Sequence, residues 1–218
     1  MSELLFRLSG IHFAYDRQRI VLRDADFELQ RGERIALVGR NGAGKTTLFH
    51  LMVGLQRPQS GTIEAFGKVR TAEKDFVEVR ARAGLLFQDS DDQLFCPTVA
   101  EDVAFGPLNL GKSAQEARII VRSTLASLGL EGFEDRITHK LSGGQKRLVA
   151  LAAVLAMEPD VLLLDEPTNA LDAETEARLT DILVHLPQSL VVISHDEEFL
   201  ARVTQARVRL ESGRLTRE

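Results

Sequence analysis

The chain has 218 residues, enough for one large domain with its own hydrophobic core. Hydrophobic residues make up 44% and charged residues 27%, so the chain can fill that core and still present a charged surface. The net charge of -5 argues against a general nucleic-acid binder, because a row of phosphates needs cationic side chains. Cys96 is the only cysteine, which excludes a disulfide framework and a thiolate metal cluster.

The first residues, Met-Ser-Glu-Leu-Leu-Phe-Arg, lack the charged and then apolar pattern of a signal peptide. The apolar stretches are short and interrupted by charges, far below the ~20 residues that span a bilayer. We therefore expect a protein that does not itself cross a membrane, so that any membrane role comes through a partner.

The predicted elements begin with antiparallel strands, because residues 4–34 alternate between apolar and polar side chains, with turn residues at 16–18 and 30–32. Apolar runs typical of buried parallel strands follow at 35–38, 161–164 and 190–193. Helical patterns lie at 45–55, 143–157 and 173–186. Strands that alternate with helices predict an α/β core, a parallel sheet flanked by helices, with an N-terminal antiparallel β subdomain.

Residues 89–140 do not follow this alternation. Ser113-Ala-Gln-Glu116 is a capping-box pattern that opens an amphipathic helix ending near Gly129. The segment before it carries Pro97, Gly106 and Pro107, which predict a loop. We therefore expect a helical subdomain at 89–145, inserted into a single domain of residues 1–218. A final strand and turn are predicted from Val208, and we expect no C-terminal extension beyond them.

A glycine-rich motif at 39–46, the candidate phosphate loop, joins the first buried run to the first helical pattern. Glycines let backbone N–H groups turn toward a polyphosphate, and the following helix presents its positive dipole end to the same anion. A lysine here adds a point charge, and the next hydroxyl can ligate Mg²⁺. A turn that binds nothing is the alternative. The expected nucleotide contacts are Gly39, Arg40, Asn41, Gly42, Ala43, Gly44, Lys45, Thr46 and Thr47.

Two acids end the second buried run. In an open α/β sheet, ligands bind beyond the carboxyl ends of the strands. Asp165 is therefore expected to hold Mg²⁺ together with Thr46, and Glu166 to orient or deprotonate an attacking water. The alternative is that both acids merely end a strand.

A second glycine-rich turn, Leu141-Ser-Gly-Gly-Gln145, stands upstream of these acids. With these motifs the chain resembles the ATP-binding-cassette ATPases over essentially its whole length. The resemblance implies that Ser142, Gly143, Gly144 and Gln145 contact ATP held by another subunit, so that hydrolysis needs two cassettes head to tail. Bare N–H groups at a helix start suit a γ-phosphate. A turn that only caps a helix is the alternative.

Three further residues take roles from this resemblance. Gln88 corresponds to the glutamine that touches Mg²⁺ and the attacking water, and His195 to the histidine that senses the γ-phosphate. Tyr15 occupies the position of the aromatic ring that stacks on adenine. Read alone, His195 is an ordinary histidine and Tyr15 a half-buried strand aromatic. Asn169 stands where many members carry serine, which leaves the detail of the contact between subunits in doubt.

The segments 89–99 and 101–109 resemble the energy-coupling-factor importers, particularly their cobalt and nickel ATPases. In that group they face a coupling helix of the membrane partner. We expect apolar docking surface from Leu94, Phe95, Val99 and Phe105, among the acids Asp92, Glu101 and Asp102. The alternative is that these apolar groups face the chain's own core.

The resemblance implies an ATP-hydrolysing import motor that uses ATP and Mg²⁺ and works as a homodimer. Its expected partners are a transmembrane coupling subunit and a substrate-binding membrane subunit at the cytoplasmic face of the membrane, with no nucleic acid. Cobalt or nickel is the expected cargo, and biotin or another vitamin is the alternative. Two rivals stay open: a non-transport ATPase of the same family, and a phosphotransferase kinase with the same phosphate loop.

Overall fold

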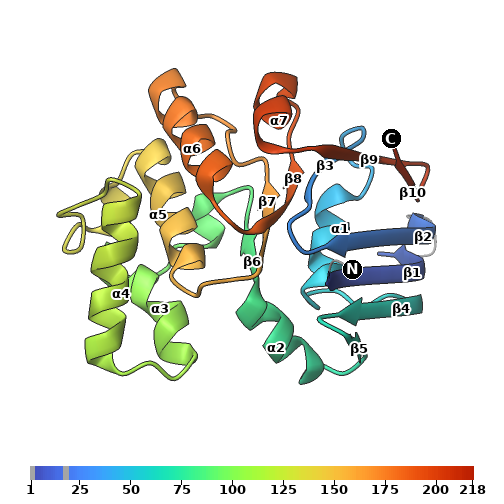
Figure 1. Cartoon of the computed structure of the whole chain (residues 1–218), viewed down its shortest axis with the longest axis horizontal. Coiled ribbons are helices and arrows are strands. Elements are labelled where there is room, and N and C mark those ends of the chain that lie inside the picture. Colours follow the sequence, from blue (N-terminus) through green and yellow to red (C-terminus); the bar gives the residue numbers. More distant parts are fainter. Residues whose placement is uncertain (1–2, 17–19) are drawn as a thin grey trace. The chain divides into compact units, whose positions relative to one another are not determined.

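The computed structural model describes residues 3–16 and 20–218 and divides into two compact units. Figure 1 shows the strands and helices of both. Unit 1 comprises Met1–Leu85, Asp160–Asp165 and Pro187–Glu218. Unit 2 comprises Leu86–Pro159 and Glu166–Leu186. In the described part of the chain, no helix combines the length and the apolar character that crossing a bilayer requires.

Unit 1 contains the predicted antiparallel sheet, with the strand order β2-β1-β4-β5. The alternation over residues 4–34 is confirmed, because β1 and β2 pair antiparallel and bury every second side chain over much of their length. The predicted turn at 16–18 lies largely outside the described residues. The strands are β1 (Leu4–Ala14), β2 (Ile20–Gln30), β4 (Ser60–Ala65) and β5 (Lys68–Arg70).

The second sheet has the order β10-β9-β3-β8-β7-β6. The three apolar runs form β3 (Arg34–Val38), β7 (Val161–Asp165) and β8 (Ser189–Ile193), and β8 pairs parallel with both of the others, as predicted. The other strands are β6 (Ala83–Leu86), β9 (Ala206–Glu211) and β10 (Arg214–Arg217).

Helices α1 (Lys45–Met52), α2 (Asp75–Arg82) and α7 (Glu197–Val203) complete unit 1. Helix α1 ends three residues before the predicted end at residue 55. Its side chains Leu48, Phe49, Leu51 and Met52 are fully buried in a core that both sheets share. A helix buried on several sides is held by this packing, which fixes the phosphate loop at its N-terminus.

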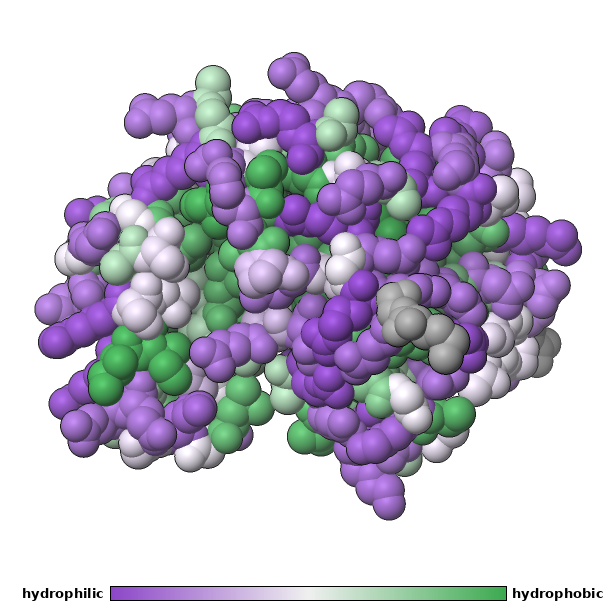
Figure 2. All heavy atoms as spheres, in the orientation of Figure 1, coloured by the Kyte–Doolittle hydropathy of each residue, from purple (hydrophilic) through white to green (hydrophobic). Residues whose placement is uncertain are grey.

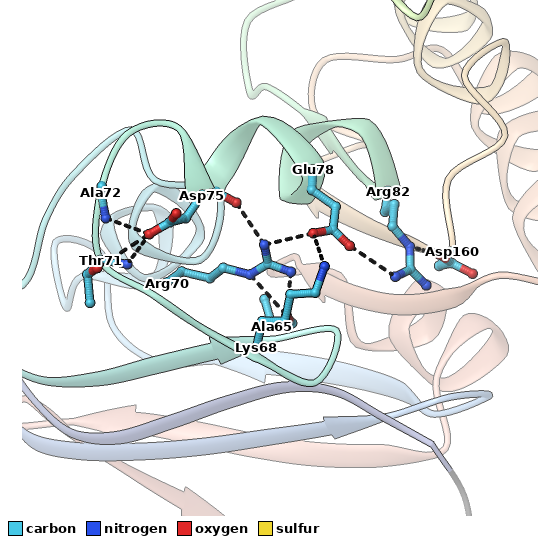
Figure 3. Close-up of polar contacts among 9 residues, drawn as sticks. All are labelled: Ala65, Lys68, Arg70, Thr71, Ala72, Asp75, Glu78, Arg82 and Asp160. Atoms are coloured by element: carbon cyan, nitrogen blue, oxygen red, sulfur yellow. Dashed lines mark hydrogen bonds and ion pairs between the residues drawn. The ribbon is translucent and has the colours of Figure 1, made fainter.

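A buried arginine ties β5 to α2, as Figure 3 shows. Arg70 donates twice to the carbonyl of Ala65, and its Nη1 donates to the carbonyl of Asp75 and to the Glu78 carboxylate at 2.9 Å. The bonds from Arg70 and Lys68 lower the pKa of Glu78 to about 2. The buried guanidinium is thus satisfied at several donors, as burial of a charge requires.

Unit 2 is helical, with α3 (Val99–Asn109), α4 (Ala114–Ser127), α5 (Gly143–Leu155) and α6 (Ala173–His185). Short 3₁₀ turns lie at Ser90–Asp92 and Thr138–Lys140. The predicted capping box of Ser113 and Glu116 is present and opens α4. A second capping box, formed by Ser142 and Gln145, opens α5.

The loop predicted around Gly106 and Pro107 is wrong, because both residues lie inside α3. A capping box of Thr98 and Glu101 starts this helix, and Val99, Val103 and Pro107 form a buried stripe at four-residue spacing. Pro107 has no N–H to donate to the carbonyl of Val103, and the burial of its ring in this stripe offsets that loss. Gly106 is needed for close packing, since a Cβ there would collide with the side chain of Met157.

Candidate functional site

The phosphate loop lies between β3 and α1 in unit 1, as the sequence predicts. Gly39 has a φ of 154°, and a Cβ there would collide with the carbonyl oxygen of Leu210 in β9. Gly44, which precedes α1, has a φ of 109°, and a Cβ there would collide with Val21 in β2. Both glycines are therefore required by backbone conformation and by contact with neighbouring strands.

Lys45 is buried, and its Nζ donates to the carbonyl oxygens of Gly39, at 2.8 Å, and Arg40, at 3.2 Å. The ammonium group is therefore bound by the backbone of its own loop. This position suits an anion bound by the surrounding N–H groups, because the cation is already held at the loop's centre.

A hydroxyl and a carboxylate meet beside this lysine. Thr46 Oγ1 donates to Asp165 Oδ2 at 2.6 Å, and Asp165 is only 3% exposed at the end of β7. Hard oxygen ligands of this kind are what Mg²⁺ prefers, and two of them lie side by side at the mouth of the phosphate loop. The residues present therefore fit a magnesium ion.

Tyr15 lies just beyond β1 and reaches the same helix. Its hydroxyl is 3.0 Å from Thr47 Oγ1, and its ring packs edge-on against Phe13 with centroids 5.0 Å apart. The residue is 48% exposed, so one tyrosine both contacts the first turn of α1 and presents ring surface to solvent. His195, also in unit 1, is exposed and lies two residues beyond the end of β8.

The other predicted residues belong to unit 2. Ser142 caps α5 and exchanges bonds with Gln145, and both Ser142 and Gly143 are exposed. Glu166 is partly buried and has a φ of 46°, in the left-handed region that non-glycine residues rarely adopt. Strained backbone of this kind concentrates at functional sites, where surrounding structure enforces it. Gln88 is exposed and lies two residues beyond the end of β6.

Sequence reasoning missed one residue beside Gln88. Arg147 follows the second glycine-rich turn and is only 4% exposed, with its guanidinium directed at the backbone of Phe87 and Gln88. Next to Lys146 in the sequence it resembles an ordinary surface cation of a helix. Only its burial distinguishes it, and no local pattern predicts that burial.

The expected docking surface is partly wrong. Leu94 and Val99 are buried in unit 2, and the Asp102 carboxylate is buried as well, where it accepts from the backbone N–H groups of Phe95 and Cys96. Asp102 also accepts from Thr138 Oγ1 at 2.9 Å. These residues face the interior because α3 needs an apolar stripe and the loop before it needs hydrogen-bond partners.

Phe95 and Phe105 do lie at the surface, 66% and 48% exposed, with ring centroids 4.8 Å apart in an edge-to-face pair. A groove of about 920 Å³ adjoins Phe105 between α3 and α4, lined also by Leu108, Val121 and Arg122. Figure 2 shows apolar surface in green over these helices. The exposed docking surface therefore reduces to Phe95, Phe105 and this groove.

Comparison with known families agrees with this geometry. A family model described as ABC transporter matches residues 22–169, more than half of the chain. The chain belongs to the ABC transporter family. It is therefore an ATPase, and the matched residues include the phosphate loop, the acidic end of β7 and the turn before α5.

Two relatives cover nearly the whole cassette. A protein of Nitratidesulfovibrio vulgaris, whose name goes no further than ABC transporter ATP-binding protein, is 51% identical over 210 residues, which cover 96% of this chain and 77% of that protein. The energy-coupling factor transporter ATP-binding protein EcfA of Methanothermobacter thermautotrophicus is 39% identical over 218 residues, covering 98% of this chain and 70% of that protein.

Two solved structures resemble the cassette over 98% of its length. One is cbiO1 of Clostridium perfringens, described as part of the ABC transporter complex cbiONQ, with a TM-score of 0.87, 34% identity and 87% of that chain covered. The other is a dimeric ATP-binding cassette in a post-hydrolysis state with ADP and Pi, with a TM-score of 0.88, 25% identity and 98% of that chain covered.

Proposed function

We propose that this cassette is the ATP-hydrolysing motor of an energy-coupling-factor importer, located at the cytoplasmic face of the membrane. The similarity to EcfA and to cbiO1 over 98% of the chain supports this assignment. Cobalt or nickel is the proposed cargo, and biotin or another vitamin is the alternative, because a motor on the membrane surface does not itself contact what is transported.

The observation that carries the mechanism is the exposed start of α5. Ser142 and Gly143 face solvent, and a Cβ added at Gly143 would meet no described atom within 4 Å apart from its chain neighbours and the backbone of its own helix. A helix N-terminus with bare N–H groups binds anions. We infer that the γ-phosphate of ATP held by a second copy occupies this place, so that two copies enclose two nucleotides.

Each of these residues then has a separate role in binding or hydrolysing ATP. Lys45 and the loop N–H groups bind the β- and γ-phosphates, while the ring of Tyr15 stacks on the adenine. Thr46 and Asp165 would hold magnesium, which when bound neutralises charge on the phosphates. Glu166 accepts a proton from the attacking water.

Gln88 and His195 complete this assignment. Gln88 would contact the attacking water and the magnesium ion, and His195 would hydrogen-bond the γ-phosphate. Closure of the two copies around ATP is favoured because only the closed state makes the contacts to the γ-phosphate. Hydrolysis removes those contacts and reopens the pair.

The Glu166→Gln variant tests the proposed motor. It should bind Mg-ATP with wild-type affinity but lose nearly all turnover, because the amide cannot accept the proton. The trapped pair should elute at twice the mass on sizing with Mg-ATP and as a monomer without it. Glu174→Gln, an exposed acid on α6, is the matched control and should keep full turnover. Wild-type hydrolysis by Glu166→Gln, or a monomer under both conditions, would refute the scheme.

The membrane partner is tested separately. We propose that its coupling helix docks on Phe95, Phe105 and the adjoining groove, where apolar surface lies beside charged side chains. Phe95→Ala and Phe105→Ala together should abolish co-purification with the importer's membrane subunits while leaving ATP binding intact. Uptake of cobalt, nickel and biotin by cells carrying Glu166→Gln then identifies the cargo. A cassette that never enriches with membrane proteins would instead support the non-transport ATPase.

A further inference from the structure

We propose that Arg147 is a positioning residue that holds the backbone of Gln88 in register with the start of α5. The proposal rests on the proposed function, because that function gives Gln88 its role at the attacking water. All the hydrogen bonds that carry it lie within unit 2.

Arg147 reaches two successive carbonyl groups. Its Nη1 donates to the carbonyl oxygen of Phe87 at 2.6 Å, and its Nη2 donates to the carbonyl oxygen of Gln88. The residue is 4% exposed, so these charge-assisted bonds are shielded from water. The guanidinium therefore fixes the peptide on both sides of the Gln88 α-carbon, which sets the direction in which its side chain leaves the backbone.

A second pair of hydrogen bonds ties the same segment to the same helix. Gln93 Oε1 accepts from the backbone N–H of Phe87 at 3.2 Å, and Gln93 Nε2 donates to the carbonyl of Ala150 at 3.3 Å. Arg147 and Ala150 are three residues apart and so lie on one side of α5. The segment 87–93 is therefore attached to α5 both at Arg147 and at Ala150.

A third interaction is weaker. Lys146 Nζ lies 2.5 Å from Asp91 Oδ1, but the Asp91 side chain is 69% exposed. An ion pair this open to solvent contributes little. Lys146 therefore provides a comparison for Arg147, since both are neighbouring cations of α5 that reach the segment 87–93.

The start of α5 is the turn proposed to bind the γ-phosphate of the second copy. Ser142 caps the helix, and Arg147 lies within its first two turns. A short capped helix moves as a rigid element. Any displacement of the turn on binding the phosphate is therefore transmitted through Arg147 to the Gln88 backbone. The geometry links phosphate binding at one end of unit 2 to the orientation of a residue proposed for hydrolysis.

The planar fork of arginine is essential to this role. Its separate N–H groups can donate to two neighbouring acceptors at once, whereas lysine presents a single ammonium on a flexible stem. Arg147→Lys should therefore retain the positive charge but fix the direction of the two carbonyls less firmly. We expect its turnover to lie between that of the wild type and that of Arg147→Met.

A double-mutant cycle in the full-length protein tests the proposal. Arg147→Met should lower the kcat of ATP hydrolysis by about tenfold or more while changing the KM for ATP less than ~2-fold, since the two hydrogen bonds that it removes orient the residue at the water and do not bind ATP. Gln88→Ala should lower kcat at least as much. In the Gln88→Ala background, Arg147→Met should have almost no further effect, because residues that act as a unit are not additive.

Matched control variants distinguish a positioning role of Arg147 from a general loss of folding stability. Arg202→Met removes an exposed arginine of α7, and Lys146→Met removes the neighbouring cation of α5; both should keep wild-type kcat. Thermal melting of every variant is followed in parallel. If Arg147→Met is unfolded, the cycle is repeated with Arg147→Lys, whose partial loss should likewise disappear in the Gln88→Ala background.

The outcomes distinguish this proposal from the one on which it rests. Wild-type turnover in Gln88→Ala would remove the proposed role of Gln88, and the inference with it. Loss of turnover in Gln88→Ala with wild-type turnover in folded Arg147→Met would overturn the inference alone. Independent losses that multiply in the double variant would also overturn it, because Arg147 would then act by another route.

Discussion

The exposed glycine at the start of α5 gives a test in which stability and activity should change in opposite directions. Gly143 is the first residue of the helix, and its φ is not positive. A Cβ added there would meet no neighbouring segment within 4 Å. Alanine favours a helix over glycine by up to ~1 kcal/mol, and less in the first turn. The Gly143→Ala monomer should therefore be more stable by about 0.5 kcal/mol, a rise of about 1–2 °C in Tm for a chain of this size.

ATP hydrolysis should nevertheless fall in this variant. If the N–H of Gly143 meets a phosphate held by a second copy, the new methyl group stands between them. Misplacement of about 1 Å at a reacting group can cost ~100-fold in rate. We expect a loss of tenfold to about a hundredfold in kcat/KM at unchanged ATP binding by the monomer, since the phosphate loop is untouched.

The assays are steady-state hydrolysis, denaturant unfolding without nucleotide, and sizing of Gly143→Ala combined with Glu166→Gln in Mg-ATP. Gly144→Ala provides the contrast, because its Cβ would lie 2.9 Å from Thr175 Cγ2 within the same unit and should lower stability. A loss of hydrolysis would indicate contact with a second copy, because a Cβ at Gly143 meets no other segment of the described chain. A Gly143→Ala protein with full hydrolysis and a normal ATP-dependent dimer would therefore refute the two-copy pocket.

Three further outcomes are expected. Lys45→Ala should weaken binding of a fluorescent ATP analogue at least about tenfold, since the buried ammonium lies inside the phosphate loop; unchanged affinity would contradict that placement. Because Arg70 lowers the folded-state pKa of Glu78 to about 2, Glu78 contributes stability above pH 4.5 that is lost as the pH falls toward 2. The stability difference between wild type and Glu78→Gln should shrink over that range in melting experiments, and a constant difference would be evidence against the linkage. Asp102→Ala should lower the free energy of unfolding by about 2–4 kcal/mol, because it removes three hydrogen bonds, including that from Thr138; urea titration with an unchanged midpoint would exclude this.

The sequence was informative where one local pattern dominates. The apolar runs of β3, β7 and β8 were predicted because strands buried on both faces leave no room for polar residues. The phosphate loop was predicted because its glycines and lysine have fixed spacing. Strands β4 and β5 and helix α2 were not predicted, since they are short and mostly polar.

Other features depend on packing between distant segments and could not be predicted. Pro107 indicated a loop, yet tertiary packing and the cap at Thr98 make that segment helical. Arg147 resembled a surface cation, although its role is set by carbonyl groups 59 and 60 residues away. The split of the docking residues, with Phe95 exposed and Val99 buried, likewise follows from which side of α3 packs inward.

The position of β3 in its sheet constrains how the protein is made. This strand carries the phosphate loop at its end, and its two neighbours are β8 and β9, which come from the last part of the chain. A ribosome therefore delivers every residue of the loop long before the strands that border it. A polypeptide broken after α6 would retain the complete loop sequence and yet lack both flanking strands. Capture of nucleotide consequently reports that synthesis has passed β9, and a product truncated before that strand should be recognisable by its failure to hold ATP.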